Sequence, residues 1–195
     1  HEPRQLACRV ARPAYRTYTP SASLSPAVAL PGRTVGLGLI TEQLLVDLEM
    51  TRSSYAELNL WATFLGALFL FGTGPALDRS LRWTTTAVLA AFSGAVFWLA
   101  HLPGPGLLLT VLILTRGLGQ SSLSLSAVAI VGKSFKKKLS TAMGVFAVAT
   151  SLLFVAAIPS ADSLLGQLGW RKVWMILAAV VLGISLLVAF LIRDP

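Results

Sequence analysis

Two arginines of this 195-residue chain stand inside segments that are mostly apolar: Arg33, whose segment also contains Glu42, and Arg116. An arginine at mid-membrane costs at least about 2.5–3.5 kcal/mol and normally faces a cavity or a partner. Gln120 follows Arg116 by four residues, so the two side chains are expected on one helix face. Because a guanidinium binds carboxylates through paired hydrogen bonds, these residues are candidates for binding an anion. The alternative is structural: Arg33 reaches toward the membrane surface, and Arg116 bonds helix carbonyls.

A second candidate for chemistry is the charged stretch from Gly74 to Trp83, which separates two apolar segments. Leu58–Leu77 and Trp83–Leu102 contain no Asp, Glu, Lys or Arg, and each is long enough to cross a hydrocarbon core of roughly 30 Å. The charged residues, Asp78, Arg79 and Arg82, are therefore expected in a tight turn at a membrane face. The simplest interpretation is a solvated loop that only sets orientation in the membrane.

Composition points to a polytopic α-helical membrane protein. The chain is 55% hydrophobic and 12% charged, about half the charged fraction of a soluble domain, and its mean hydropathy is +0.74. The net charge of +8 is explained by Lys- and Arg-rich cytoplasmic loops, so no nucleic-acid partner is expected.

Enzyme and metal sites lack the necessary residues. Cys8 is the only cysteine, and His1 and His101 are too far apart for a ligand pair. An intramembrane serine protease would need a membrane histidine and a complete serine motif, but Ser121 and Ser122 stand in an incomplete one. We expect no enzyme, no metal and no cofactor.

The apolar segments predict six transmembrane helices after a polar tail. The tail, residues 1–23, is expected to be a disordered cytoplasmic segment, with a transit peptide as the alternative. The spans are expected at about 24–46, 58–77, 83–102, 107–131, 139–158 and 173–192, within a domain of residues 24–195. Thr51 or Ser53 is expected to cap the second helix, and Pro159–Gly169 is expected to be a polar loop.

Basic residues predict the orientation. With the N-terminus inside, one face carries Arg4, Arg9, Arg12, Arg16, Arg79, Arg82, Lys133, Lys136, Lys137, Lys138 and Arg193, and the other carries Arg52, Arg171 and Lys172. The asymmetry predicts that both termini are cytoplasmic.

The charged stretch also resembles the loop between helices two and three of the major facilitator superfamily, with the pattern G-x-x-x-D-R-x-G-R-R. Gly74, Asp78, Arg79 and Arg82 match, whereas Leu81 and Trp83 depart from it. The segment Phe135–Gly144 resembles the family's basic loop and the start of its helix five, and Gly169-Trp170-Arg171 its entry to helix six. Arg116-Gly-Leu-Gly-Gln120 resembles its helix-four motif in part. The resemblance covers roughly residues 30–195, the amino-terminal six-helix half, similar to the bacterial monocarboxylate and oxalate/formate branch.

The resemblance implies a secondary active transporter, which moves a small solute by alternating access in a bacterial inner membrane. Helices one and four line the central cavity in this family, so Arg33, Arg116 and Gln120 would bind the solute. Arg33 and Arg116 each lie nine residues from a span end, roughly 14 Å deep, so a carboxylate solute is expected between them. Gly74, Asp78, Arg79 and Arg82 would form a conformational switch, with Arg79 and Arg82 as local partners of Asp78.

The family builds its site between two six-helix halves. We therefore expect a fragment, a truncated product, or a half that pairs with a second six-helix half or a homodimer partner in the bilayer. The alternative function is a non-transporting membrane scaffold or pseudo-transporter.

Overall fold

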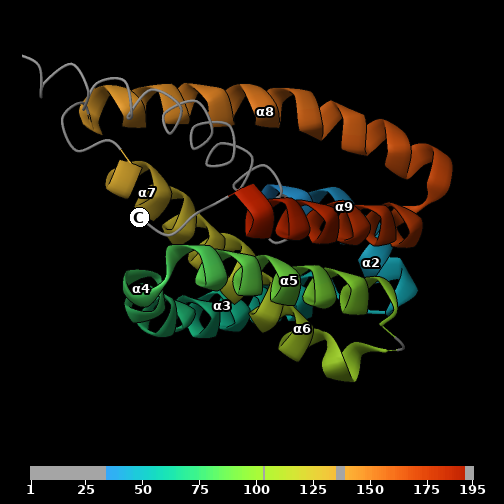
Figure 1. Ribbon diagram of the computed structural model, residues 1–195. Coiled ribbons are helices and arrows are strands. Elements are labelled where there is room, and N and C mark those ends of the chain that lie inside the picture. Colours follow the sequence, from blue (N-terminus) through green and yellow to red (C-terminus); the bar gives the residue numbers. More distant parts are fainter. Residues whose placement is uncertain (1–33, 103, 135–138, 192–195) are drawn as a thin grey trace, which may run out of the picture.

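The chain is all α-helical over the residues that the computed structural model describes, 34–102, 104–134 and 139–191 (Figure 1). The elements are α2 (Thr34–Asp47), α3 (Arg52–Ala67), α4 (Phe69–Arg79), α5 (Leu81–Ala100), the 3-10 turn η2 (Pro105–Leu107), α6 (Leu108–Thr115), the π-helical segment η3 (Arg116–Ser122), α7 (Leu123–Ser134), α8 (Leu139–Leu168) and α9 (Trp170–Leu191). The predicted fold class, an all-α membrane protein, is confirmed.

Five helical segments within the described residues are long and apolar enough to cross a membrane: Arg52–Arg79, Leu81–Ala100, Pro105–Lys133, Leu139–Leu168 and Trp170–Phe190. They overlap the second to sixth predicted spans, although Leu139–Leu168 extends ten residues beyond the predicted end at 158 and Arg52–Arg79 begins six residues before 58. The first predicted span, 24–46, is described only from Thr34, as the 14-residue α2. Arg33 and the tail of residues 1–23 lie outside the described residues.

The second helix begins earlier than its apolar segment. Thr51 caps α3, since its Oγ1 accepts from the Ser54 amide at 3.3 Å, which confirms one of the two expected capping residues. A capping hydroxyl satisfies an amide that has no partner within the helix. The helix therefore starts at Arg52, in the polar connection, and not at Leu58.

The expected polar loop after the fifth span is wrong, because α8 is one helix of 30 residues that passes through Pro159 and ends at Leu168. A proline removes one backbone donor, and hydroxyls can occupy carbonyls nearby in a membrane helix. Here Ser160 Oγ donates to the Ala156 carbonyl at 2.7 Å, and Ser163 Oγ to the Ser160 carbonyl at 2.9 Å. The helix ends at Gly169, whose φ of 77° is the left-handed conformation that glycine adopts readily.

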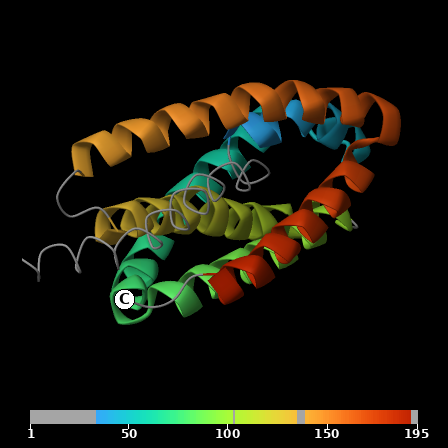
Figure 2. The same ribbon diagram turned by 45° about the horizontal axis from the view of Figure 1, so that its top comes forward.

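The core of the bundle is the contact between α5 and α9, which lie side by side in both views (Figures 1 and 2). Phe92, Val96 and Trp174 are fully buried there. Two hydroxyls cross the contact: Ser93 Oγ donates to the Ala178 carbonyl at 2.8 Å, and Ser185 Oγ to the Thr86 carbonyl at 3.1 Å. By contrast, α8 runs along one edge (Figure 1), with Ala161 and Leu165 as its only buried residues among those described.

The helix directions define two ends of the bundle. The α4–α5 turn and the end of α7 lie at one end, called here the Asp78 end. The end of α2, the start of α3 and the start of α9 lie at the other, called the Asp47 end.

Candidate functional site

Arg116 is the first residue of η3, a π-helix of 7 residues within the long helical segment Pro105–Lys133. Its side chain is only 3% exposed. Nη1 donates to Gln120 Oε1 at 2.9 Å, so the two side chains share a face, as their spacing predicts. π-Helical turns inside α-helices are rare and frequent at functional sites.

Two glycines bring α3 against this segment. A Cβ built on Gly66 would lie 2.9 Å from the Gly117 amide nitrogen and 3.3 Å from the Arg116 Cβ. A Cβ on Gly117 would lie 2.7 Å from the ring of Phe69. Small residues permit such close approach of membrane helices. Gly66 lies fourteen residues beyond Arg52, roughly 21 Å along the axis, so Arg116 is held near the middle of the 28-residue α3–α4 segment.

A buried hydroxyl pair attaches η3 to α4. The Oγ atoms of Thr73 and Ser122 are 2.8 Å apart, and Thr73 also donates to the Phe69 carbonyl at 2.7 Å. A hydroxyl has one proton, so Ser122 is the donor of the pair. The Arg116 segment is therefore bonded to the helix that ends in the charged stretch.

The charged stretch is helical almost throughout. Asp78 and Arg79 occupy the last turn of α4, Arg82 the first turn of α5, and Ser80 alone separates the helices. Ser80 caps α5, because its Oγ accepts from the Trp83 amide at 3.4 Å. The expected tight turn therefore consists of a single extended residue.

Lys133, at the end of α7, pairs with the charged stretch. Its Nζ lies 3.3 Å from Asp78 Oδ1 and donates to the Leu77 carbonyl at 2.8 Å. That carbonyl is in the last turn of α4, where it lacks a helical partner and where a cation is favourable. Sequence reasoning considered Arg79 and Arg82 as partners of Asp78 and missed Lys133.

Arg82 lies over the Trp83 ring, with Cζ 5.1 Å from the centroid. Gly74 is half-buried, and no described atom lies within 4 Å of a Cβ built there.

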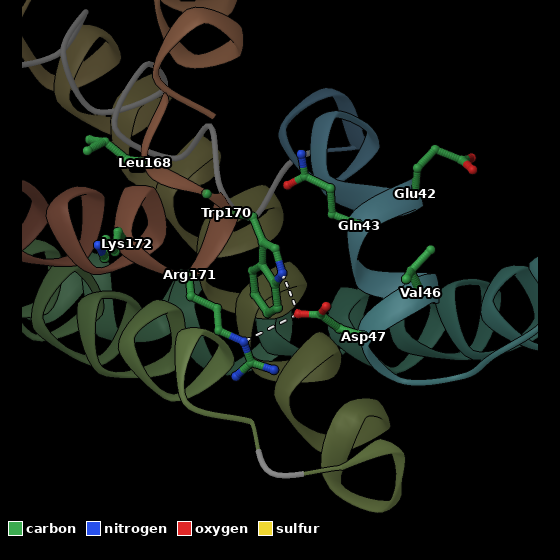
Figure 3. A pocket seen from close by; sticks show the side chains of 9 residues that line it. Glu42, Gln43, Val46, Asp47, Leu168, Trp170, Arg171 and Lys172 are labelled. Carbon is green, nitrogen blue, oxygen red and sulfur yellow. Dashed lines mark hydrogen bonds and ion pairs between the residues drawn. The ribbon is translucent and has the colours of Figure 1, made fainter. Parts of the chain in front are cut away.

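Another polar group joins three helices at the Asp47 end (Figure 3). Asp47 Oδ2 accepts from Trp170 Nε1 at 2.8 Å and from Arg171 Nε at 3.4 Å. Arg171 Nη1 also donates to the carbonyls of Ala100 and Leu102. An open pocket of about 570 Å³ borders this group, between the end of α2 and the start of α9.

Tyr55 of α3 is a polar residue that sequence reasoning missed. It is 6% exposed, and its hydroxyl has no hydrogen-bond partner among the described residues. Thr41 of α2 is adjacent without reaching hydrogen-bond geometry. Tyr55 stands among polar residues near the start of α3, so nothing in the sequence indicates that its side chain is buried.

Of the predicted site residues, the structure brings Arg116 and Gln120 together. It places Gly74, Asp78, Arg79 and Arg82 at the Asp78 end, and Arg33 lies outside the described residues. No cluster of three or more His, Cys, Asp or Glu side chains that would suit a metal occurs in the described ranges.

Comparison with known proteins identifies one family. The family model described as Major Facilitator Superfamily matches residues 23–195, nearly the whole chain. No curated protein matches the sequence. Members of this family are transporters embedded in the lipid bilayer, and they bind small solutes. The family match agrees with the helical architecture and with the landmarks at Gly74–Arg82 and Gly169–Arg171, and the chain belongs to the Major Facilitator Superfamily.

Proposed function

We propose that this transporter carries a small organic anion by secondary active transport with alternating access, and that Arg116 and Gln120 bind the anion. The observation that carries the proposal is the burial of Arg116, whose Cβ lies against Gly66 of α3 near the middle of the membrane-spanning segment. A cation at that depth is costly unless it meets an anion or polar groups. Gln120 accepts from Arg116 Nη1 at 2.9 Å and so orients the guanidinium. Guanidinium groups bind carboxylates in bidentate pairs, which is why a small organic anion is the proposed solute.

The experiment is equilibrium binding of small monocarboxylates and dicarboxylates to the purified protein in lipid nanodiscs. Arg116→Gln should lower affinity at least tenfold, and Arg116→Lys should restore only part of it, because lysine cannot form the bidentate pair. Lys172→Gln is the matched control, since it removes one exposed basic charge at the Asp47 end. Equal affinities for Arg116→Gln and the control would refute the anion site. Binding without flux after reconstitution would favour the non-transporting alternative.

The second element of the proposal is that Gly74, Asp78, Arg79 and Arg82 form a conformational switch. Support comes from the Asp78–Lys133 pair, which links the ends of α4 and α7. Because α7 continues from η3 and Ser122 bonds α4, a movement of the Arg116 segment would act on both partners of this pair. Asp78→Asn should therefore slow transport while leaving anion affinity unchanged. If Asp78→Asn lowered both the transport rate and the anion affinity, Asp78 would have a structural role instead.

Orientation and assembly are the third element. The Asp78 end carries Arg79, Arg82 and Lys133 beside one acid, and Lys136–Lys138 follow in the sequence. This supports a cytoplasmic Asp78 end with both termini inside. In a Cys8→Ser background, an impermeant maleimide should label Lys172→Cys from outside, and Arg79→Cys only after permeabilisation. The reverse pattern would overturn the orientation.

A second six-helix half or a homodimer partner would complete the cavity. Support comes from α8, whose Val145, Val148, Leu152 and Val155 are each at least 60% exposed and follow a seven-residue repeat that suits a packed helix. The resemblance to the bacterial monocarboxylate and oxalate/formate branch supports a bacterial inner membrane. The test compares cross-linking to a partner protein from Leu152→Cys on α8 and from Phe190→Cys on α9. Cross-linking from Leu152→Cys alone would support an assembly through α8, whereas equal cross-linking from both variants would oppose it.

A further inference from the structure

The face of α3 that leads to Arg116 carries two polar atoms without partners. Tyr55, Asn59, Ala62 and Gly66 follow one another at spacings of four, three and four residues, which places them on one face of the helix. Tyr55, Ala62 and Gly66 are buried, and Asn59 is half-buried. The face therefore lies in the interior and ends at the Gly66 contact with Arg116.

Both polar groups are sealed from solvent. The Tyr55 hydroxyl and the Asn59 Oδ1 are buried atoms with no hydrogen-bond partner among the described residues. Interior polar atoms are almost always bonded, so unbonded ones require an explanation such as water or a ligand. Their demands are complementary, because the phenol is a donor that lacks an acceptor and the amide oxygen is an acceptor that lacks a donor.

A hydroxyl group satisfies both demands at once, since it accepts from Tyr55 and donates to Asn59. Side chains four residues apart on a helix have Cβ atoms about 5–6 Å apart, which suits two contacts to one small group. Asn59 lies seven residues from Gly66, roughly 10 Å along the axis, and the long Arg116 side chain starts beside Gly66.

We propose that Tyr55 and Asn59 are specificity-determining residues that bind a hydroxyl of the solute, so that the transported anion is a hydroxycarboxylate. The inference rests on the proposed anion site at Arg116. The carboxylate is bound by Arg116 and Gln120, and the hydroxyl by Tyr55 and Asn59, which lie toward the Asp47 end. Solutes without the hydroxyl leave both groups unbonded and are bound less tightly.

The test compares acids that differ only by a hydroxyl: 3-hydroxybutyrate with butyrate, and malate with succinate. Affinities are measured with the purified protein in nanodiscs. The wild type should prefer at least one hydroxy acid by about tenfold. Tyr55→Phe and Asn59→Leu should each reduce that preference by about fivefold, since a neutral hydrogen bond contributes roughly this factor. Binding of butyrate and succinate should change less than twofold.

The control is Thr85→Val, which removes another buried hydroxyl without a partner among the described residues, on α5. It should leave the preference unchanged. If the wild type binds the members of each pair equally, or if Thr85→Val has the same effect as Tyr55→Phe, the inference is wrong although the anion site stands. If Arg116→Gln leaves all affinities intact, the anion site fails instead. Tyr55→Phe removes only an unbonded oxygen, so it should fold, and its melting temperature verifies this.

Discussion

Replacing Gly66 by alanine tests the contact that holds Arg116 in the interior. The added Cβ would lie 2.9 Å from the Gly117 nitrogen and 3.3 Å from the Arg116 Cβ. These neighbours are backbone or next to it, so the helices must separate, and overpacking of this kind costs about 1–3 kcal/mol. Alanine also gains about 1 kcal/mol over glycine in a helix interior.

Gly72→Ala separates the two effects. It provides the same gain in helix propensity, but no described atom lies within 4 Å of its added Cβ. The difference in unfolding free energy between the two variants is therefore the cost of the contact alone, about 1–3 kcal/mol.

Melting in nanodiscs, followed by tryptophan fluorescence at one heating rate, measures this difference. For a chain of this length about 1 kcal/mol shifts Tm by about 2–4 °C, so Gly66→Ala should melt about 2–12 °C below Gly72→Ala. Anion affinity should fall in Gly66→Ala only, because Arg116 is displaced. Equal melting temperatures would refute the argument that α3 and η3 touch through their backbones.

Three other perturbations test the remaining contacts. Ser122→Ala removes the bond to Thr73 and should lower the free energy of unfolding by about 0.6 kcal/mol, at most about 1.7, as measured by thermal unfolding. The control is Ser151→Ala, whose hydroxyl bonds only within α8 and whose removal should cost less. Equal losses of stability in the two variants would contradict the interhelical role of Ser122. Lys133→Met keeps the aliphatic stem but removes the bonds to Asp78 and Leu77. It should speed amide hydrogen exchange at the end of α4 while lowering the free energy of global unfolding by less than about 1 kcal/mol. Unchanged exchange rates would count against the pairing of Lys133 with Asp78. Asp47→Asn removes the charge beside Arg171 and should loosen the start of α9. In a background that lacks the other tryptophans, this should appear as a red shift of Trp170 fluorescence emission. An unchanged spectrum would show that the contacts of Asp47 with Trp170 and Arg171 do not hold α9 in place.

Local relationships in this chain could be predicted from sequence. The Arg116–Gln120 contact depends only on spacing along one helix, and the Thr51 cap depends on a hydroxyl just before a helix. Apolar segments located five of the long helices because a bilayer sets their length. These features involve residues a few positions apart, so the sequence alone carries the information.

The remainder depends on how distant segments meet. Lys133 reaches Asp78 across more than fifty residues, and nothing in either segment distinguishes it from the neighbouring lysines. The π-helical turn at Arg116–Ser122 has no sequence signature, since the same residues would form an α-helix. Pro159 was interpreted as the start of a loop because a proline removes a backbone donor from a helix, and the sequence alone does not show that the helix continues through it.

The two hydroxyls that join α5 to α9 have a consequence for biosynthesis. Ser93 donates to Ala178, and Ser185 to Thr86, so each bond joins segments that leave the ribosome far apart in time. When α5 first enters the bilayer, its partner helix has not yet been made, and the buried face that contains Phe92 and Val96 is exposed to lipid or to the insertion machinery. Helix α5 must therefore wait for α9, and membrane quality control has an interval in which the unfinished chain can be recognised. Released chains truncated before Trp170 should be degraded faster than released chains that include α9.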